Sequence, residues 1–147
     1  MNYIRYPSNF ETISKNLQSY QKLSHFFKHV ELHFELTVFA LNVFYVPDTI
    51  LFLQQHFPLS KVSLNFLSQP SNFSIDQIPK ELANKTLDKL EELVAHNVSS
   101  EDIQTLVKRL GQSNGELSYL SQVVQRHDHY RGTSFPKSFS EISRFFS

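Results

Sequence analysis

The chain has 147 residues, no cysteine, and equal numbers of basic and acidic side chains, 14 of each. The lack of cysteine excludes disulfides, thiolate nucleophiles and thiolate metal sites. A net charge of zero argues against a nucleic-acid partner, because neutralising phosphates requires a surplus of Lys and Arg. Phe supplies 14 residues and Trp none. Because a Phe ring carries no polar group, we expect most of these rings in the core.

The hydropathy pattern gives no sign of a membrane segment. No apolar run approaches the roughly 18 residues that a spanning helix requires. Met1–Pro7 lacks the apolar stretch of a signal peptide. We therefore expect no membrane partner and a cytoplasmic location. The length favours a single domain over residues 1–147.

The first element predicted along the chain is a helix. Ser8 and Glu11 have the spacing of a capping box, in which the serine accepts a hydrogen bond from a free N–H and the acid reaches back. Apolar residues then recur at helical spacing over residues 10–20. We expect this helix to end at about Leu23.

Two strands separated by a helix are predicted next. Apolar and polar residues alternate over Val30–Val38, which is typical of a strand with one buried face. The run Val38–Val46 is apolar on both sides, so we expect the strand to continue there inside a parallel sheet. Pro47 then opens a helix that ends at Pro58. Alternation over Val62–Phe66 predicts the second strand.

The C-terminal half predicts four helices after a loop at residues 68–72. Pro79 opens the first of them, and Gly111 is expected to end the second. The other three starts carry a serine followed three residues later by an acidic residue. These pairs are Ser99 with Asp102, Ser113 with Glu116, and Ser138 with Glu141.

The predicted order is α-β-α-β-α-α-α-α, with a right-handed βαβ unit. The fold class is α/β: a partial (β/α) barrel fragment with two parallel strands and a helical C-terminal half. Residues 1–75 would form the βα units, and residues 76–147 would pack on them. Two parallel strands leave two open edges, whereas parallel sheets are normally wider and covered. The chain either pairs its edges with another chain or is part of a larger barrel.

Several segments resemble radical S-adenosylmethionine (SAM) enzymes with a twitch-type auxiliary domain. The order and spacing of these segments carry the resemblance, which touches nearly the whole chain. They are Tyr3–Ser8 with Asn16 and Leu17, Leu36–Val43, Pro47–Phe57 followed by Val62–Leu67, and Asp128–Phe135 with Phe139, Glu141 and Ile142 beyond it.

This resemblance implies the later βα units of a barrel. In complete members, a [4Fe-4S] cluster held by three cysteines reduces SAM to a radical that abstracts hydrogen from a substrate. Iron–sulfur clusters are held by thiolates, and this chain has none. We therefore expect it to hold no cofactor and to be inactive alone. The missing N-terminal barrel part would be on a separate chain, or the sequence would be a fragment with that part in an upstream reading frame. The alternatives are a non-catalytic protein-interaction module using an exposed sheet edge, or a remnant.

Three polar residues at or near the strand ends are candidate ligand contacts. In barrels, ligands meet residues at the C-terminal ends of strands. The resemblance implies that Thr37, Asn42 and Asn65 would contact SAM or substrate in a complete enzyme. The plainer interpretations are that Asn42 satisfies main-chain groups at a turn and that Asn65 is a hydrogen-bonded residue of a partly exposed sheet.

The histidines do not predict a metal site. His127 and His129 flank an aspartate, but residues two apart on a helix point about 200° apart. His25, His29 and His33 are spaced by four, as in a helical stack. We reject that site, because the alternation from residue 30 places His33 on a strand. No nucleophile elbow or phosphate-binding glycine loop is present.

Overall fold

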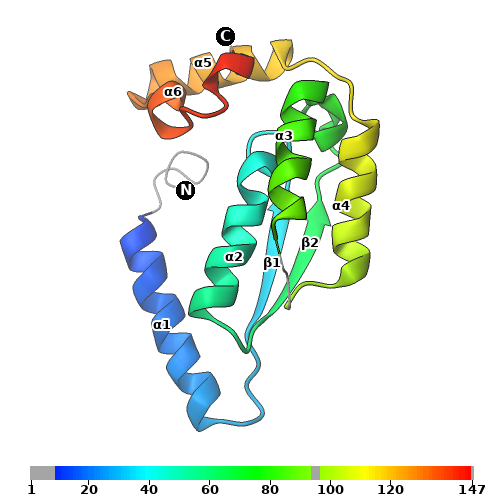
Figure 1. Cartoon of the computed structure of the whole chain (residues 1–147). Helices are drawn as coiled ribbons and strands as arrows, with labels where there is room; N and C mark the ends of the chain where they lie inside the picture. The colour runs from blue at the N-terminus through cyan, green and yellow to red at the C-terminus, as the bar shows by residue number, and fades with distance from the viewer. Residues whose placement is uncertain (1–8, 94–96, 147) are drawn as a thin grey trace.

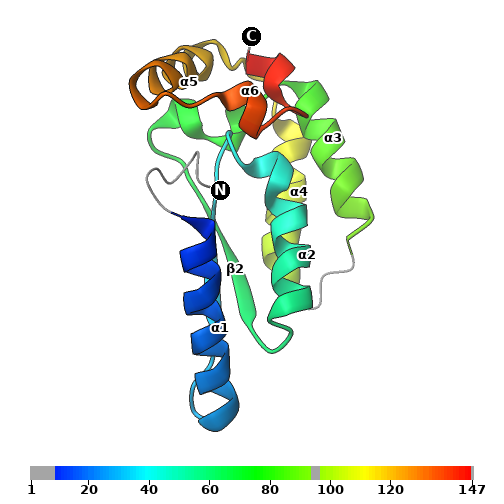
Figure 2. The same cartoon turned by 90° about the vertical axis from the view of Figure 1, so that its left-hand side faces the viewer.

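The computed structural model describes residues 9–93 and 97–146. Strands β1 (His33–Val38) and β2 (Lys61–Phe66) form a parallel pair and are joined by helix α2 (Val46–His56). Helices α3 (Lys80–Glu91) and α4 (Ser100–Gln112) lie with α2 on one face of the sheet, as Figures 1 and 2 show. The predicted α/β class and the parallel pairing are confirmed.

The remaining elements surround this unit. Helix α1 (Phe10–Phe26) lies beyond β1 in Figure 1 and in front of it in Figure 2, so it runs alongside the outer edge of the sheet. Helices α5 (Ser118–Arg131) and α6 (Phe135–Ser138) lie at the end of the molecule toward which both strands run. Gly132 ends α5 in the left-handed conformation, at φ +61°, where glycine carries no steric penalty.

The core is built from the even-numbered side chains of the strands and the inner faces of the helices. Val38 and Leu64 are buried against the helices, and the same cluster includes Ile50, Leu106 and Phe135. Both halves of the chain thus contribute to one core. Burial of each such side chain stabilises the fold by roughly 1.5–3 kcal/mol.

The predicted continuation of the first strand to Val46 is wrong. Strand β1 ends at Val38, and the chain turns through a 3₁₀ helix, Val43–Tyr45, into α2. The Ala40 N–H donates to the Phe73 carbonyl rather than to β2. Residues 40, 41, 43 and 44 are buried. The segment is apolar on both sides because this turn is enclosed by the core, and a buried turn and a buried strand have the same composition.

The predicted start of the helix after α4 is also wrong. Ser113 ends α4 rather than starting α5, since its hydroxyl donates to the Leu110 carbonyl over 2.9 Å. Gly111 lies inside α4 instead of stopping it. The chain then passes against the Gln77 main chain, where a Cβ on Gly115 would lie 2.4 Å from the Gln77 Cα. That contact leaves no room for a side chain at residue 115, and α5 begins only at Ser118.

The two ends of the chain differ from expectation as well. The last predicted helix, from Ser138, is wrong: α6 ends at Ser138, and a 3₁₀ helix follows at Ser143–Phe146. The Ser134 hydroxyl caps α6 by accepting the Lys137 N–H. At the N-terminus, Ser8 lies outside the described residues, and the Asn9 side chain caps α1 by accepting the Glu11 N–H.

Candidate functional site

The exposed face of the sheet carries a ladder of polar pairs between the two strands. The odd-numbered side chains of both strands lie on this face, away from α2, α3 and α4. Two pairs bridge the strands: His33 Nε2 with Ser63 Oγ at 3.1 Å, and Asn65 Nδ2 to Glu35 Oε1 at 2.8 Å. A third pair joins Lys61 Nζ of β2 to Glu31 Oε2, just before β1, at 2.6 Å. The hydrogen bond from Lys61 lowers the pKa of the Glu31 carboxyl. The polar side chains of this face are therefore hydrogen-bonded to one another.

The outer edge of β2 is closed along its first half by main-chain and side-chain acceptors. The Val62 N–H donates to the Asn97 carbonyl, and Val62 forms an isolated parallel bridge with Val98. The Leu64 N–H donates to Asp102 Oδ2 over 3.0 Å. The Ser99 hydroxyl accepts the Asp102 N–H at the start of α4, as the predicted pairing of these residues requires. The Asp102 carboxylate is therefore placed where it accepts a hydrogen bond from β2.

The outer edge of β1 is closed only at its C-terminal end. The Asn42 side chain donates to the Thr37 carbonyl over 2.7 Å and accepts the Phe39 N–H at 2.9 Å. The pairing of β1 with β2 directs the N–H and C=O groups of His33 and Glu35 away from β2. Within residues 9–93 and 97–146, no hydrogen bond reaches these groups. They form an open strand edge.

The three predicted ligand contacts, Thr37, Asn42 and Asn65, lie at or just after the C-terminal ends of the two strands. Asn42 and Asn65 already form hydrogen bonds within the chain. Thr37 and Asn65 are paired across the sheet, and both side chains are exposed. Asn65 donates to Glu35, and Asn42 binds main chain on both sides of the turn. These bonds match the structural interpretations given from the sequence, in which Asn42 satisfies main-chain groups at a turn and Asn65 is a hydrogen-bonded residue of the sheet. Contact with SAM stays a prediction, and iron–sulfur ligation does not fit a chain without cysteine.

A second polar cluster lies just after β2. Arg109 on α4 donates from Nη2 to Asp76 Oδ2 at 2.7 Å and to Ser74 Oγ at 2.9 Å, and its guanidinium lies 5.4 Å from the Phe66 ring centre. The hydrogen bond from Arg109 is the main cause of the lowered pKa of the Asp76 carboxyl. Because acid and base neutralise each other, the cluster ties α4 to the sheet rather than presenting a reactive group.

A third cluster surrounds Tyr45 at the start of α2. Burial is the main cause of its pKa being raised to about 12, and the charge and hydrogen bond of Glu141 and the charge of Asp48 add to the effect. Lys89 pairs with Asp48, and its ammonium lies 4.2 Å from the Phe44 ring centre. A tyrosine with a raised pKa stays protonated at neutral pH, so Tyr45 cannot serve there as a base.

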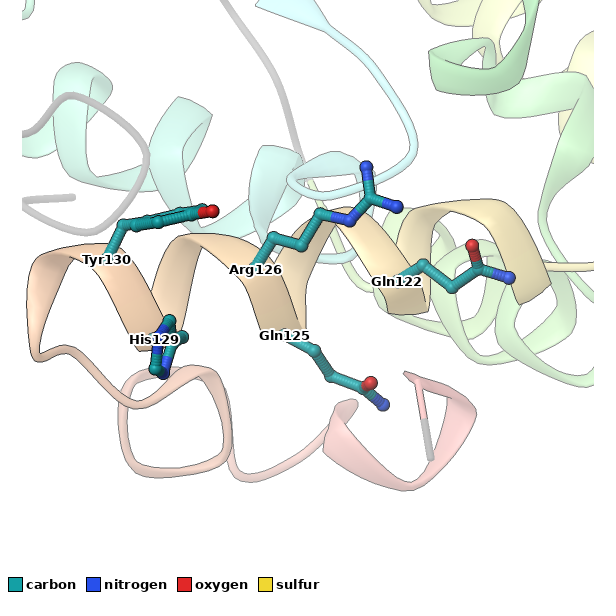
Figure 3. A pocket seen from close by; sticks show the side chains of 5 residues that line it. All are labelled: Gln122, Gln125, Arg126, His129 and Tyr130. Atoms are coloured by element: carbon teal, nitrogen blue, oxygen red, sulfur yellow. The ribbon is translucent and has the colours of Figure 1, made fainter.

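The exposed side of α5 offers a hollow but no enclosed cavity. Its lining comes from this one helix: Gln122, Gln125, Arg126, His129 and Tyr130, as Figure 3 shows. Ligand sites are normally concave and enclosed by several elements. A surface formed by one helix therefore does not define a small-molecule site.

The histidines of α5 do not form a metal site with their neighbours. Asp128, between the two, is occupied by the Thr133 hydroxyl and the Phe135 N–H at 2.9 and 2.8 Å. His127 and His129 lie within one regular helix. Across the described residues, no three His, Asp or Glu side chains are grouped as ligands for a metal ion.

The fold and this site define a mixed α/β chain whose two-stranded sheet has an open edge at β1. In comparisons with known proteins, no family model, curated protein or solved structure matches the chain. In the described part of the chain, no helix is both long and apolar enough to cross a bilayer. The resemblance to radical SAM enzymes remains a prediction from the sequence segments.

Proposed function

We propose that this chain is a non-catalytic interaction module that binds another protein by adding an extended segment of it to the open edge of β1. The observation that carries the proposal is the asymmetry of the two edges. Asn97 and Asp102 satisfy the outer N–H groups of Val62 and Leu64 on β2, whereas those of His33 and Glu35 on β1 have no partner among the described residues. An incoming strand therefore meets paired N–H groups along the first half of β2 and unpaired ones at His33 and Glu35 of β1.

The charge pattern of the open edge supports recognition of a polar or basic strand. Glu35 stands on the exposed face next to this edge, and its neighbours His33 and Thr37 are polar residues. Opposite charges directly across neighbouring strands contribute roughly 0.2–1 kcal/mol. A Lys or Arg opposite Glu35 would therefore favour one register of the bound segment.

Helix α1 runs alongside this edge, and an incoming strand would displace it. No residue of α1 is buried. It contacts α2 through the Phe10 and Phe52 rings, 6.1 Å apart, and through the Gln21 amide, which donates to the His56 carbonyl. Leu17, which is partly buried, packs against the cluster of Leu53, Phe57 and Val62. Because no side chain of α1 is fully buried, displacing α1 costs less free energy than displacing a core helix. Partner binding is therefore expected to release α1 from α2.

Photo-crosslinking in cells that express the full-length protein tests this proposal. A photoreactive amino acid replaces Thr37 beside the edge, and a matched control carries it in place of the exposed Lys108 on α4. We expect a discrete crosslinked protein from position 37 and none from position 108. Glu35→Pro should abolish the crosslink, because it removes an outward N–H while leaving the bonds between β1 and β2 in place. His33→Pro is the second edge variant.

Circular dichroism shows whether each proline variant remains folded. A crosslink that survives both folded variants, or that is equally strong from position 108, contradicts strand addition at β1. A variant that unfolds is set aside in favour of the other, because each removes a different outward N–H group of the same edge.

Completion of a barrel is the second candidate function, favoured by the parallel register of the strands. Thr37 and Asn65 lie opposite each other at the C-terminal ends of β1 and β2, as a wedge of a (β/α) barrel requires. In that case the segment added at β1 would be a parallel strand of a chain that carries the cluster-binding cysteines. The two candidates differ in the direction of the added strand and in the cysteines of the partner, so the sequence and crosslinked site of the captured protein distinguish them.

A further inference from the structure

Exposed apolar side chains gather at one end of the molecule. Among the described residues, ten large apolar side chains are exposed, and five of them lie in two short segments. These five are Tyr20, Leu23, Phe26 and Phe27 at the end of α1, and Leu59 in the turn before β2. Phe26 is 80 % exposed and Leu59 is 81 % exposed, so neither contributes to the core. We call these five residues the apolar tip.

The two segments of the apolar tip lie next to each other. Residues from the end of α1 and from the α2–β2 turn line one shared hollow, and they include His25, Lys28, Pro58 and Leu59. In Figures 1 and 2, the end of α1 and the α2–β2 turn lie at the same end of the molecule, opposite α5. The apolar tip is thus a local feature of the surface. Large apolar side chains that are exposed together at one end of a molecule indicate an interaction site.

Basic residues accompany the apolar tip. Residues 20–31 and 56–61 contain three lysines, Lys22, Lys28 and Lys61, and one acidic residue, Glu31. This gives a local surplus of two positive charges in a chain whose net charge is zero. Glu31 is paired with Lys61, which leaves Lys22 and Lys28 as the source of the surplus.

From this combination we infer that the apolar tip docks on the surface of an anionic lipid bilayer. Phe26 and Leu59 would enter the boundary between headgroups and acyl chains, while Lys22 and Lys28 meet the lipid phosphates. Charge complementarity favours lipid over protein, because the cores of protein interfaces are depleted of lysine. Docking of this kind requires no spanning helix, so it agrees with the lack of one in the described chain. It revises the expectation that the chain has no membrane partner.

Vesicle co-sedimentation of the full chain tests this inference. Vesicles of phosphatidylcholine alone are compared with vesicles in which phosphatidylserine makes up about one third of the lipid. We expect binding to the anionic vesicles, at least tenfold weaker binding to the neutral ones, and loss of binding at high salt. Phe26→Ser and Lys28→Glu should each weaken binding to anionic vesicles severalfold.

Two control variants match these changes on the remote part of the surface. Tyr130→Ser removes a ring that is 83 % exposed on α5, and Lys108→Glu reverses an exposed lysine on α4. Both should bind anionic vesicles as the unmodified chain does. All four positions are exposed, so unfolding curves should coincide and exclude a folding defect.

Three outcomes would overturn the inference. One is the absence of binding to anionic vesicles, and another is an equal loss of binding in the control variants. The third is concentration-dependent self-association, without vesicle binding, that Phe26→Ser abolishes; this result would assign the apolar tip to a protein contact. The open edge of β1 is not altered by these variants, so failure here leaves strand addition at β1 to its own test.

Discussion

The side-chain amide of Asn42 donates to the main-chain carbonyl of Thr37 over 2.7 Å. The same side chain accepts the Phe39 N–H, so it offers β1 the two groups that a peptide of a neighbouring strand would offer. Asn42 therefore ends the open edge of β1 with its own side chain. Pairing with another chain is restricted to the part of β1 before Thr37.

The first prediction concerns this closure. Asn42→Ala leaves a carbonyl and an N–H without their partner, and we expect it to lower the free energy of unfolding by about 1–3 kcal/mol. Asn42→Asp keeps the acceptor but loses the donor, so it should fall between the alanine variant and the unmodified chain. Urea unfolding followed by circular dichroism measures both.

Asn72→Ala is the matched control for these variants, because Asn72 is exposed in the loop after β2. Its effect should stay within about 0.5 kcal/mol. If Asn42→Ala were as mild as this control, the closure of the turn would not be the role of Asn42, and the ligand contact suggested by the family resemblance would gain support.

The strand β2, the start of α2 and the cap of α4 were predicted correctly, because each is marked by a pattern of a few neighbouring residues. The alternation that ends at Phe66 defines β2 to within a residue, and Pro47 stands in the first turn of α2. Ser99 caps α4 by accepting the N–H groups of Glu101 and Asp102, as its spacing predicted. Each of these signals operates over a few residues and needs no knowledge of the rest of the fold.

Features that depend on distant contacts could not be predicted in the same way. Ser113 has the spacing of a helix cap, but the approach of Gly115 to Gln77 prevents a helix there. The pairing of Asp102 with Leu64 spans 38 residues. Most Phe rings are at least partly buried, as expected, and the three exposed ones, Phe10, Phe26 and Phe27, lie at the two ends of α1.

The second prediction compares two glycines in opposite environments. A Cβ on Gly115 would lie 2.4 Å from the Gln77 Cα, so Gly115→Ala forces main chain apart and should destabilise the fold by about 1–3 kcal/mol. Gly111 lies inside α4 with open space around it, so Gly111→Ala should stabilise the fold by about 0.5–1 kcal/mol. Thermal unfolding of the two variants should shift in opposite directions. Shifts of the same sign would contradict the close approach of residue 115 to Gln77.

The third prediction concerns acid stability. Arg109 lowers the pKa of the Asp76 carboxyl, so the folded state binds this proton less readily than the unfolded state. The resulting stabilisation is fully present above the unfolded pKa of about 4 and is lost as the pH falls through the lowered value. Half of the Asp76 side chain is exposed, which limits the effect to about 0.5–1 kcal/mol.

Urea unfolding of the unmodified chain and of Asp76→Asn measures this dependence. The difference in unfolding free energy between them should be present at neutral pH and should shrink in strong acid, where both side chains are uncharged. A difference that is independent of pH would show that the ion pair with Arg109 makes no contribution.

The fourth prediction concerns the alkaline limit of the fold. The pKa of Tyr45 is raised to about 12, chiefly by burial and then by Glu141, so the folded state holds the phenol proton more tightly than the unfolded state. This contribution to stability is fully present below the unfolded pKa of about 10 and is lost as the pH rises toward 12. Absorbance of tyrosinate during alkaline titration should show a late step from Tyr45.

Substitutions assign this step to its residue and to its cause. Tyr45→Phe should remove the late step, and Glu141→Gln should move it to lower pH, because the variant lacks the negative charge that opposes ionisation. Tyr130→Phe, on a ring that is 83 % exposed, should leave the late step unchanged. If Glu141→Gln left the midpoint where it was, burial alone would account for the raised pKa, and the contact between the C-terminal segment and the start of α2 would carry no electrostatic coupling.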